Sequence, residues 1–156
     1  MPSRPRHKVV LPGYCYHAYA RGNNKRKVFR DDDDYRTYMS FFLEAKEMFN
    51  IKILFYCLMP NHLHFIFAAG KQGISKFLHR VQMLYTRYFV KKYDYVGTIW
   101  QGRPKTKPIE SEEYLLACGQ YIENNPVRAG LARRPKDWPH SSYRARCLGS
   151  NDRVLT

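Results

Sequence analysis

Residues 57–67, CLMPNHLHFIF, contain two histidines separated by one apolar residue within an otherwise apolar run. Side chains alternate between the two faces of a strand, so His62 and His64 point to one face while Leu63, Phe65 and Phe67 point to the other. One face can therefore pack on a core while the opposite face presents two imidazole nitrogens to a single metal ion. We predict that this stretch organises the fold around a functional face.

Two imidazoles do not complete a metal site that acts on a substrate. Such a site needs at least one further protein ligand and an open coordination position, so another part of the chain must supply the third ligand. The alternative is that His62 and His64 are ordinary strand histidines, satisfied by hydrogen bonds or solvent. Residues elsewhere in the chain have to decide between these two interpretations.

The composition indicates one domain that binds a polyanion. A chain of 156 residues is long enough for a single domain with its own core, which we expect over residues 1–156. The 27 Lys and Arg exceed the 13 Asp and Glu and give a net charge of +14, and the 13 Tyr and 9 Phe can stack on unpaired bases. Residues 1–8, MPSRPRHK, are expected to form a basic arm and residues from about 147 to 156 a loose tail.

The cysteines and the hydropathy indicate a cytoplasmic protein with no membrane partner. Cys15, Cys57, Cys118 and Cys147 are scattered and form no CxxC pair, so neither a zinc knuckle nor a disulfide scaffold is expected. Nor does any apolar run approach the ~20 residues of a membrane span.

The chain around the histidine stretch predicts an α+β order of strand, helix, strand, strand and helix. The expected elements are a strand over 14–20, a helix from the Asp31–Asp34 run to Asn50, strands over 51–59 and 62–69 joined by a turn at 60–61, and an amphipathic helix from Ile74 through Phe89. The acidic run offers an alternative carboxylate metal site, but acidic first-turn residues complement a helix dipole and apolar residues follow at helical spacing. A short strand or ordered loop is expected over 98–103.

A further helix, from Glu110 or Ser111 to about Asn125, supplies candidates for the rest of the site. Pro126 is expected to stop this helix. Tyr121 and Asn125 are four residues apart and project together. An oxygen of Asn125 beside two histidines can hold Mg²⁺ or Mn²⁺, and the neighbouring phenol can attack a phosphorus. The alternative is that Tyr121 only fills the core.

The basic residues form two candidate DNA surfaces. The loop over 21–27, RGNNKRK, combines turn residues with four cations, as expected where a chain meets phosphates, although a solvated hairpin tip has the same composition. The helix that follows Ile74 carries a basic face, which is either a DNA track or a solvated surface.

Several motifs in one order resemble the single-tyrosine HUH transposases, and among them the REP-associated, IS200-like tyrosine transposases. The motifs are LPGY (11–14), RGNN (21–24), YCLMPNHLH (56–64), YTRYF (85–89), WQGR (100–103), YIENNPVRAGL (121–131) and DWP (137–139). Relatives often have Phe-Lys-Ser after Gln-Gly-Arg, whereas Pro104-Lys105-Thr106 stands here, which places local DNA contacts in question. The resemblance implies a ferredoxin-like fold with an antiparallel sheet and helices packed on it.

The resemblance also implies a site and a mechanism. His62 and His64 would bind Mg²⁺ or Mn²⁺ together with Asn125, and Tyr121 would be the nucleophile that cleaves single-stranded DNA near a hairpin, as found in REP-like repeats, through a 5′-phosphotyrosine. Candidate DNA-contacting residues are Arg21, Asn23, Asn24, Lys25, Arg80, Arg87, Gln101, Arg103, Lys105 and Arg128. The expected place of action is the bacterial nucleoid, with the protein as a monomer or homodimer.

Two other functions fit part of the pattern. A catalytically silent regulator that grips structured single strands would keep the basic and aromatic residues without needing the metal or the phenol. A metal-dependent nuclease that activates water would keep the histidines and leave no covalent adduct.

Overall fold

The computed structural model describes residues 15–68 and 74–155. The basic arm expected over residues 1–8 and the LPGY motif lie outside this part of the chain. The strands are β1 (Cys15–Arg21), β2 (Lys52–Met59), β3 (His62–Ala68) and β4 (Lys105–Ile109). The helices are α1 (Asp32–Met48), α2 (Ile74–Tyr93), α3 (Glu112–Glu123), α4 (Asn125–Arg128) and α5 (Tyr143–Leu148), with short 3₁₀ turns at η2 (Asn23–Lys25) and η3 (Pro135–Asp137).

The four strands form one antiparallel sheet in the order β2-β3-β1-β4. Strand β3 lies between β1 and β2, so the first strand-helix-strand unit is split by the strand that follows it. This arrangement is ferredoxin-like, and it confirms the predicted α+β class.

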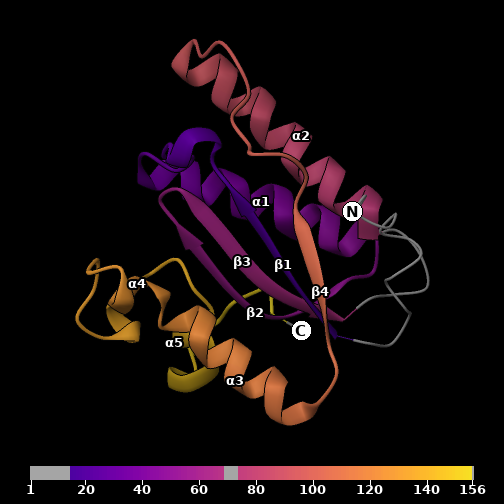
Figure 1. Cartoon of the computed structure of the whole chain (residues 1–156), viewed down its shortest axis with the longest axis vertical. Helices are drawn as coiled ribbons and strands as arrows, with labels where there is room; N and C mark the ends of the chain where they lie inside the picture. The colour runs from indigo at the N-terminus through magenta and orange to yellow at the C-terminus, as the bar shows by residue number, and fades with distance from the viewer. Residues whose placement is uncertain (1–14, 69–73, 156) are drawn as a thin grey trace.

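Helices cover both faces of the sheet, as Figure 1 shows, with α1 and α2 on one side and α3 to α5 on the other. Leu63, Phe65 and Phe67 pack with α1 and α2 in the larger core, whereas Ile66 packs with α3 in a smaller one. His62 and His64 share the face of Ile66, because side chains alternate along β3. The predicted division of this strand into a core face and a histidine face is confirmed.

The acidic run begins helix α1, as the sequence predicted. Asp31 caps the helix by accepting a hydrogen bond from the backbone N–H of Asp34 at 2.9 Å. Asp34 is fully buried and accepts hydrogen bonds from Lys92 (2.8 Å), Tyr88 (2.9 Å) and Tyr93 at the end of α2. Burial alone raises the pKa of Asp34, but these donors lower it overall, so the carboxylate joins α1 to α2 as an anion.

Of the two forms predicted for residues 98–103, a short strand or an ordered loop, the structure has the loop, and the fourth strand lies farther on. Only Trp100 forms a β-bridge there, with Gly22, while the strand itself is β4, five residues farther on. Pro108 makes this segment a poor strand in isolation, but β4 lies at the edge of the sheet, where proline is tolerated.

The predicted end of the last long helix was wrong. Helix α3 ends at Glu123, and the short helix α4 begins at Asn125, with Asn124 as the cap residue between them. Pro126 does not stop this helical turn, because it lies in its first residues, where no backbone N–H is needed.

The segment after α5, expected as a loose tail, makes several contacts with the sheet. Val154 is buried, Leu155 forms a β-bridge with Ile53, and the Tyr56 hydroxyl donates to Asp152 at 2.5 Å. Across residues 15–68 and 74–155, no helix combines the length and apolar character that crossing a membrane requires.

Candidate active site

His62 lies at the start of β3 with both ring nitrogens engaged. Its Nδ1 is 2.6 Å from Oδ1 of Asn61, the neighbouring turn residue, and its Nε2 is 3.1 Å from Nδ2 of Asn125. The first residue of α4 therefore meets a strand histidine that is 63 positions away in the sequence. This contact brings together two of the three predicted metal ligands.

His64 contacts a third histidine, which the sequence analysis did not single out. Nε2 of His17, on β1, lies 2.9 Å from Nδ1 of His64, and the two rings stack with centroids 5.1 Å apart. Strand alternation in the segment YCYHAYA could have placed His17 on one face with Tyr19, but only the β1–β3 register sets that face beside His64.

All three histidines are weak bases in the folded protein. Burial, followed by repulsion from Lys107, lowers the pKa of His17 to about 4. Burial, followed by the neighbouring His17 and His62, lowers the pKa of His64 to about 3. Burial and Arg21 also lower the pKa of His62. The imidazoles are therefore neutral at pH 7, which is the form that binds metal ions.

Tyr121 lies on α3, close in the chain to Asn125, with 58% of its surface exposed. The guanidinium of Arg128 lies over its ring, 3.6 Å from the centroid, and donates to the Tyr121 backbone carbonyl at 2.7 Å. The alternative that Tyr121 only fills the core does not hold, because α3 turns Cys118 and Ile122 inward instead. Tyr114, on the same helix, is also half exposed.

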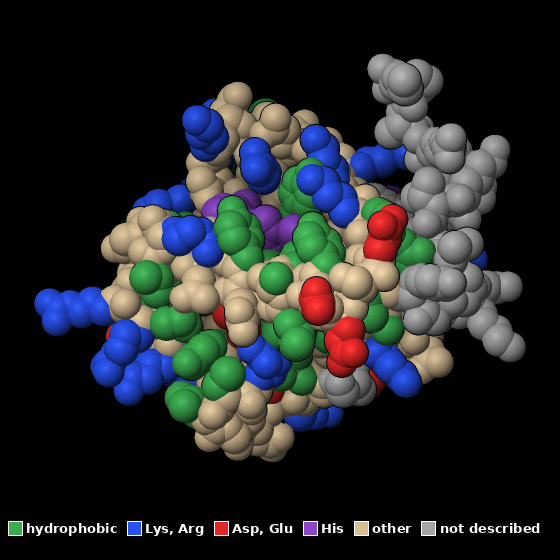
Figure 2. Space-filling view, turned by 60° about the horizontal axis from the view of Figure 1, so that its bottom comes forward, with side chains coloured by type: hydrophobic (Ala, Val, Ile, Leu, Met, Phe, Trp, Pro, Cys, Tyr) green, Lys and Arg blue, Asp and Glu red, His purple; other side chains and the backbone are tan. Residues whose placement is uncertain are grey.

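Nine of the ten candidate DNA-contacting residues fall into two groups, and the tenth, Arg128, lies over the Tyr121 ring. Arg21, Gln101, Arg103 and Lys105 line a hollow with Tyr19 and Ala20 at the β1–β4 side of the sheet. Figure 2 shows the histidine side chains recessed in the surface, with Lys and Arg side chains along the rim of the recess. This group surrounds the histidine face with positive charge.

The second group is divided between helix α2 and the η2 turn. Arg80 and Arg87 are on α2, which covers the opposite face of the sheet, and Arg80 pairs there with Glu44 of α1 at 3.0 Å. Asn23, Asn24 and Lys25 form the η2 turn after β1, where Asn24 and Lys25 have positive φ angles of 54° and 59° and exposed side chains. The structure therefore does not gather all the candidates on one surface.

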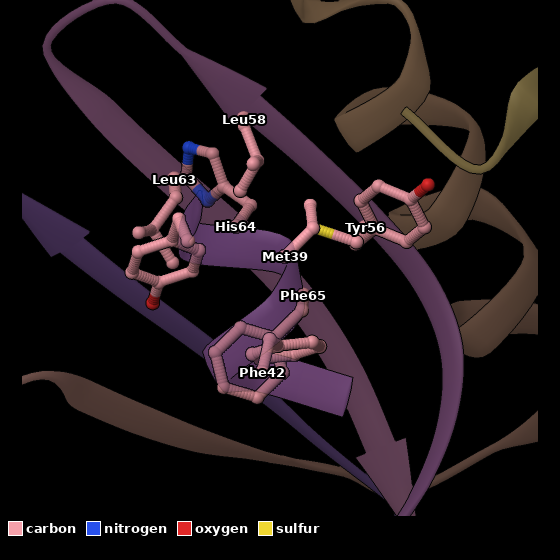
Figure 3. A pocket seen from close by; sticks show the side chains of 8 residues that line it. Met39, Phe42, Tyr56, Leu58, Leu63, His64 and Phe65 are labelled. Carbon is pink, nitrogen blue, oxygen red and sulfur yellow. The ribbon is translucent and has the colours of Figure 1, made fainter. Parts of the chain in front are cut away.

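A second hollow, lined by residues of α1, β2 and β3, belongs to the core. Figure 3 shows Met39 and Phe42 facing Leu58, Leu63 and Phe65, while the imidazole of His64 points away from the two phenylalanines. The lining is almost entirely apolar, so this hollow has no chemistry to offer a substrate.

The side chains beside β3 can hold a divalent cation only if the Asn125 amide is one of its ligands. Within the described ranges, no group of three or more His, Cys, Asp or Glu side chains is placed to hold a metal ion. Two neutral imidazoles and the Asn125 amide remain. An amide oxygen suits Mg²⁺ and Mn²⁺, whereas imidazole favours softer ions, so of these two cations the mixed set favours Mn²⁺.

Comparison with known proteins adds the family to this geometry. The family model described as transposase IS200 like matches residues 11–125, which include β1, the histidine strand and Tyr121. The chain belongs to the IS200-like transposase family.

A named relative agrees with this assignment. A protein of Haemophilus influenzae that carries the name REP-associated tyrosine transposase is 27% identical over 119 residues, which cover 68% of this chain and 66% of that protein. The chain thus spans slightly less than two thirds of this relative.

Two solved structures share the fold of this IS200-like transposase chain. One is a REP-associated tyrosine transposase bound to a REP hairpin, with a TM-score of 0.76, 19% identity and coverage of 100% of this chain and 92% of that one. The other, described as a transposase of Deinococcus radiodurans, has a TM-score of 0.53 and 16% identity, and covers 80% and 97% of the two chains. The first comparison shows that a solved transposase structure shares this fold.

Proposed function

We propose that this protein is a metal-dependent transposase that cleaves and rejoins single-stranded DNA beside hairpins. The observation that carries the proposal is the contact between His62 on β3 and Asn125 on α4, because α4 directly follows the helix that bears Tyr121. This contact supports a site that combines the strand histidine pair, the Asn125 amide and the exposed phenol of Tyr121. Family membership supports the same activity.

In this proposal the chain's own residues prepare the reaction. His62, His64 and Asn125 would hold a Mg²⁺ or Mn²⁺ ion, and that ion would supply positive charge to neutralise the scissile phosphate. The Tyr121 oxygen attacks the phosphorus and its proton passes to a base, while the bond from phosphorus to the 3′ oxygen breaks. The 3′ oxygen takes a proton from water and leaves as a 3′-OH, and the 5′ phosphate stays joined to Tyr121 as a 5′-phosphotyrosine. A later 3′-OH reverses the exchange and joins the strands without external energy.

The proposed substrate is a DNA hairpin flanked by unpaired bases, such as a REP-like repeat. Cations at the histidine face, among them Arg21, Arg103 and Lys105, can contact phosphates. Arg128 lies over Tyr121 and can hold its ring in place before the strand arrives. A structural relative is bound to a REP hairpin, which favours this class of partner, and we place the activity in the bacterial cytoplasm at the nucleoid.

The test is covalent capture of labelled DNA. Wild-type protein with Mn²⁺ and a hairpin-bearing single strand should yield an adduct that survives denaturation. Tyr121→Phe removes only an exposed hydroxyl, so folding and DNA binding should persist while adduct formation falls at least ~1000-fold, as expected for loss of a nucleophile. Tyr114→Phe, on the same helix and similarly exposed, is the matched control and should react normally.

Other outcomes assign the function differently. An adduct with Tyr121→Phe would move the nucleophile to another tyrosine. Cleavage by wild type without any adduct would make the protein a nuclease that activates water. Tight binding without cleavage would make it a silent regulator, and full activity of a folded His62→Ala, His64→Ala variant would remove the metal from the mechanism.

A further inference from the structure

Each of the two histidine ligand candidates has a neighbouring side chain within hydrogen-bond distance of its Nδ1 atom. Asn61 Oδ1 lies 2.6 Å from Nδ1 of His62, and His17 Nε2 lies 2.9 Å from Nδ1 of His64. We propose that His17 is a positioning residue that fixes the proton of His64 on Nδ1 and keeps a lone pair on its Nε2 for a metal ion, as Asn61 does for His62. The inference rests on the metal site of the proposed function.

Only one tautomer of His62 fits its hydrogen bond to Asn61. An amide oxygen accepts hydrogen bonds and cannot donate, so Nδ1 of His62 must carry the proton that Asn61 receives. The Nε2 of His62 then keeps its lone pair. Asn125 Nδ2, a donor, lies 3.1 Å from that lone pair, which agrees with this tautomer.

Two tautomers of His64 fit its hydrogen bond to His17. Only one of them allows Nε2 of His64 to bind a metal ion. A hydrogen bond between two neutral imidazoles needs one N–H and one lone pair. If His17 donates, Nε2 of neutral His64 carries the proton and cannot bind a cation. If His64 donates from Nδ1, its Nε2 has a lone pair, and the proton of His17 is on its Nδ1.

The fold keeps His17 in this place. His17 and Tyr19 are on the same face of β1, and the β1–β3 register pairs Tyr19 with His64 and His17 with Ile66, so His17 lies diagonally beside His64. The two imidazoles stack at an interplanar angle of 30° and are partly buried. Hydrogen bonds from metal-binding histidines to such neighbours set the tautomer and the ring orientation.

His17 does not act as a third ligand in this assignment. No three-residue set of His, Cys, Asp and Glu capable of holding a metal occurs in the described segments, so His17 is not grouped with His62 and His64 around one point. Its Nε2 is also engaged with the nitrogen of His64 that does not face the proposed metal. The third ligand is therefore Asn125.

The first measurement is Mn²⁺ affinity, by calorimetry on the DNA-free full-length protein. His17→Met replaces the imidazole acceptor with a thioether of similar size, which accepts only weakly, and should weaken Mn²⁺ binding about 10- to 100-fold, the usual effect of losing such a partner. His17→Gln keeps an acceptor near the position of Nε2 and should recover most of the affinity. Tyr19→Phe, a same-face neighbour whose ring lies 5.9 Å from that of His64, is the matched control and should bind like wild type.

The second measurement, ¹⁵N NMR of the histidine rings in metal-free protein, separates this inference from the proposed function. Wild type should show His64 protonated at Nδ1, and His17→Met should shift the proton toward Nε2. If His64 is protonated at Nε2 in wild type, or if His17→Met binds Mn²⁺ as tightly as wild type, the positioning role is overturned. If wild type binds no Mn²⁺ but His64 is protonated at Nδ1, the metal mechanism fails and the hydrogen-bond assignment stands.

Discussion

Burial makes the histidines of this sheet poor proton acceptors, and that property couples stability to pH. A histidine in the unfolded chain has a pKa of about 6.5. In the folded protein burial, with His17 and His62 nearby, lowers the pKa of His64 to about 3, and burial, with Lys107 nearby, lowers the pKa of His17 to about 4. Below pH 6.5 the unfolded chain therefore binds more protons than the folded chain, and stability decreases as the pH falls.

We expect the free energy of unfolding to decrease between pH 7 and pH 5, with His64 alone contributing about 2 kcal/mol of the loss. Urea titrations in the presence of a chelator measure this change without interference from metal ions. The variant His64→Gln lacks the titrating group and should have a shallower pH dependence. An equally steep dependence in that variant would mean that other groups are responsible.

The neighbours of Tyr121 explain why this candidate nucleophile is on the surface. Asn125 must reach His62, and Cys118 and Ile122 must face the core, so the intervening Tyr121 is left exposed. Arg128, one turn beyond Asn125, then covers the ring of Tyr121. Arg128 was predicted to contact DNA, and the structure adds a contact with the proposed nucleophile that spacing alone did not indicate.

At the scale of the element, helix α3 lies unusually close to the sheet at one point. A Cβ atom at Gly119 would lie 2.3 Å from the nearest ring carbon of Phe55 on β2, which is far inside normal contact distance. Glycine is required here for the close approach. The distance between α3 and β2 in turn sets the position of Tyr121, two residues farther along.

Gly119→Ala should therefore lower stability by about 1–3 kcal/mol, the usual cost of overpacking a core. It should also slow adduct formation, because α3 has to move outward. Chemical denaturation and the covalent-capture assay measure the two effects. Gln120→Ala, exposed on the same helix, should change stability by less than ~0.5 kcal/mol.

A compensating variant tests the cause of that loss. Phe55→Leu combined with Gly119→Ala makes room for the new methyl group and should recover part of both properties. If the double variant is worse than the sum of the single variants, the clash with Phe55 is not the cause.

The sheet places part of the excess positive charge of the whole molecule on its histidine face. Lys105 and Lys107 of β4 stand on the histidine face beside β1, and Lys107 lies over the ring of Tyr19 at 5.7 Å. The basic residues of α2 lie on the other side of the molecule. The histidine face is therefore the surface on which a DNA strand can contact both the Lys side chains and the proposed active site.

DNA binding should depend steeply on salt. If on the order of five phosphates are contacted, affinity for a single strand should fall about 100-fold between 50 and 200 mM salt. Fluorescence anisotropy at several salt concentrations gives the slope. Lys105→Gln with Lys107→Gln should make the slope shallower, whereas Arg87→Gln with Lys91→Gln on α2 should leave it nearly unchanged.

The same titration tests the preferred form of DNA. A hairpin flanked by unpaired bases should bind more tightly than a blunt duplex of equal length. Equal affinities would contradict the single-strand interpretation, and a larger effect of the α2 pair than of the β4 pair would place the DNA on the opposite face.

Local features of the chain were predictable from the sequence because they depend on neighbouring residues. Strand alternation set His62 and His64 apart from Leu63, Phe65 and Phe67, and the acidic run at Asp31 predicted the start of α1. Apolar spacing predicted α2, and the interval of four residues put Tyr121 and Asn125 in one region, although α3 ends between them. The antiparallel α+β class follows from the order of these elements.

Contacts between distant segments required the tertiary structure. Strand β4, with Pro108, exists because β1 offers it an edge, and no local pattern predicts that pairing. The His17–His64 hydrogen bond depends on a register between two strands separated by a helix and another strand, and a shift of one residue would turn His17 to the opposite face. Local periodicity tells which face a side chain takes on its own element, but only the packing of the elements decides which side chains meet across them.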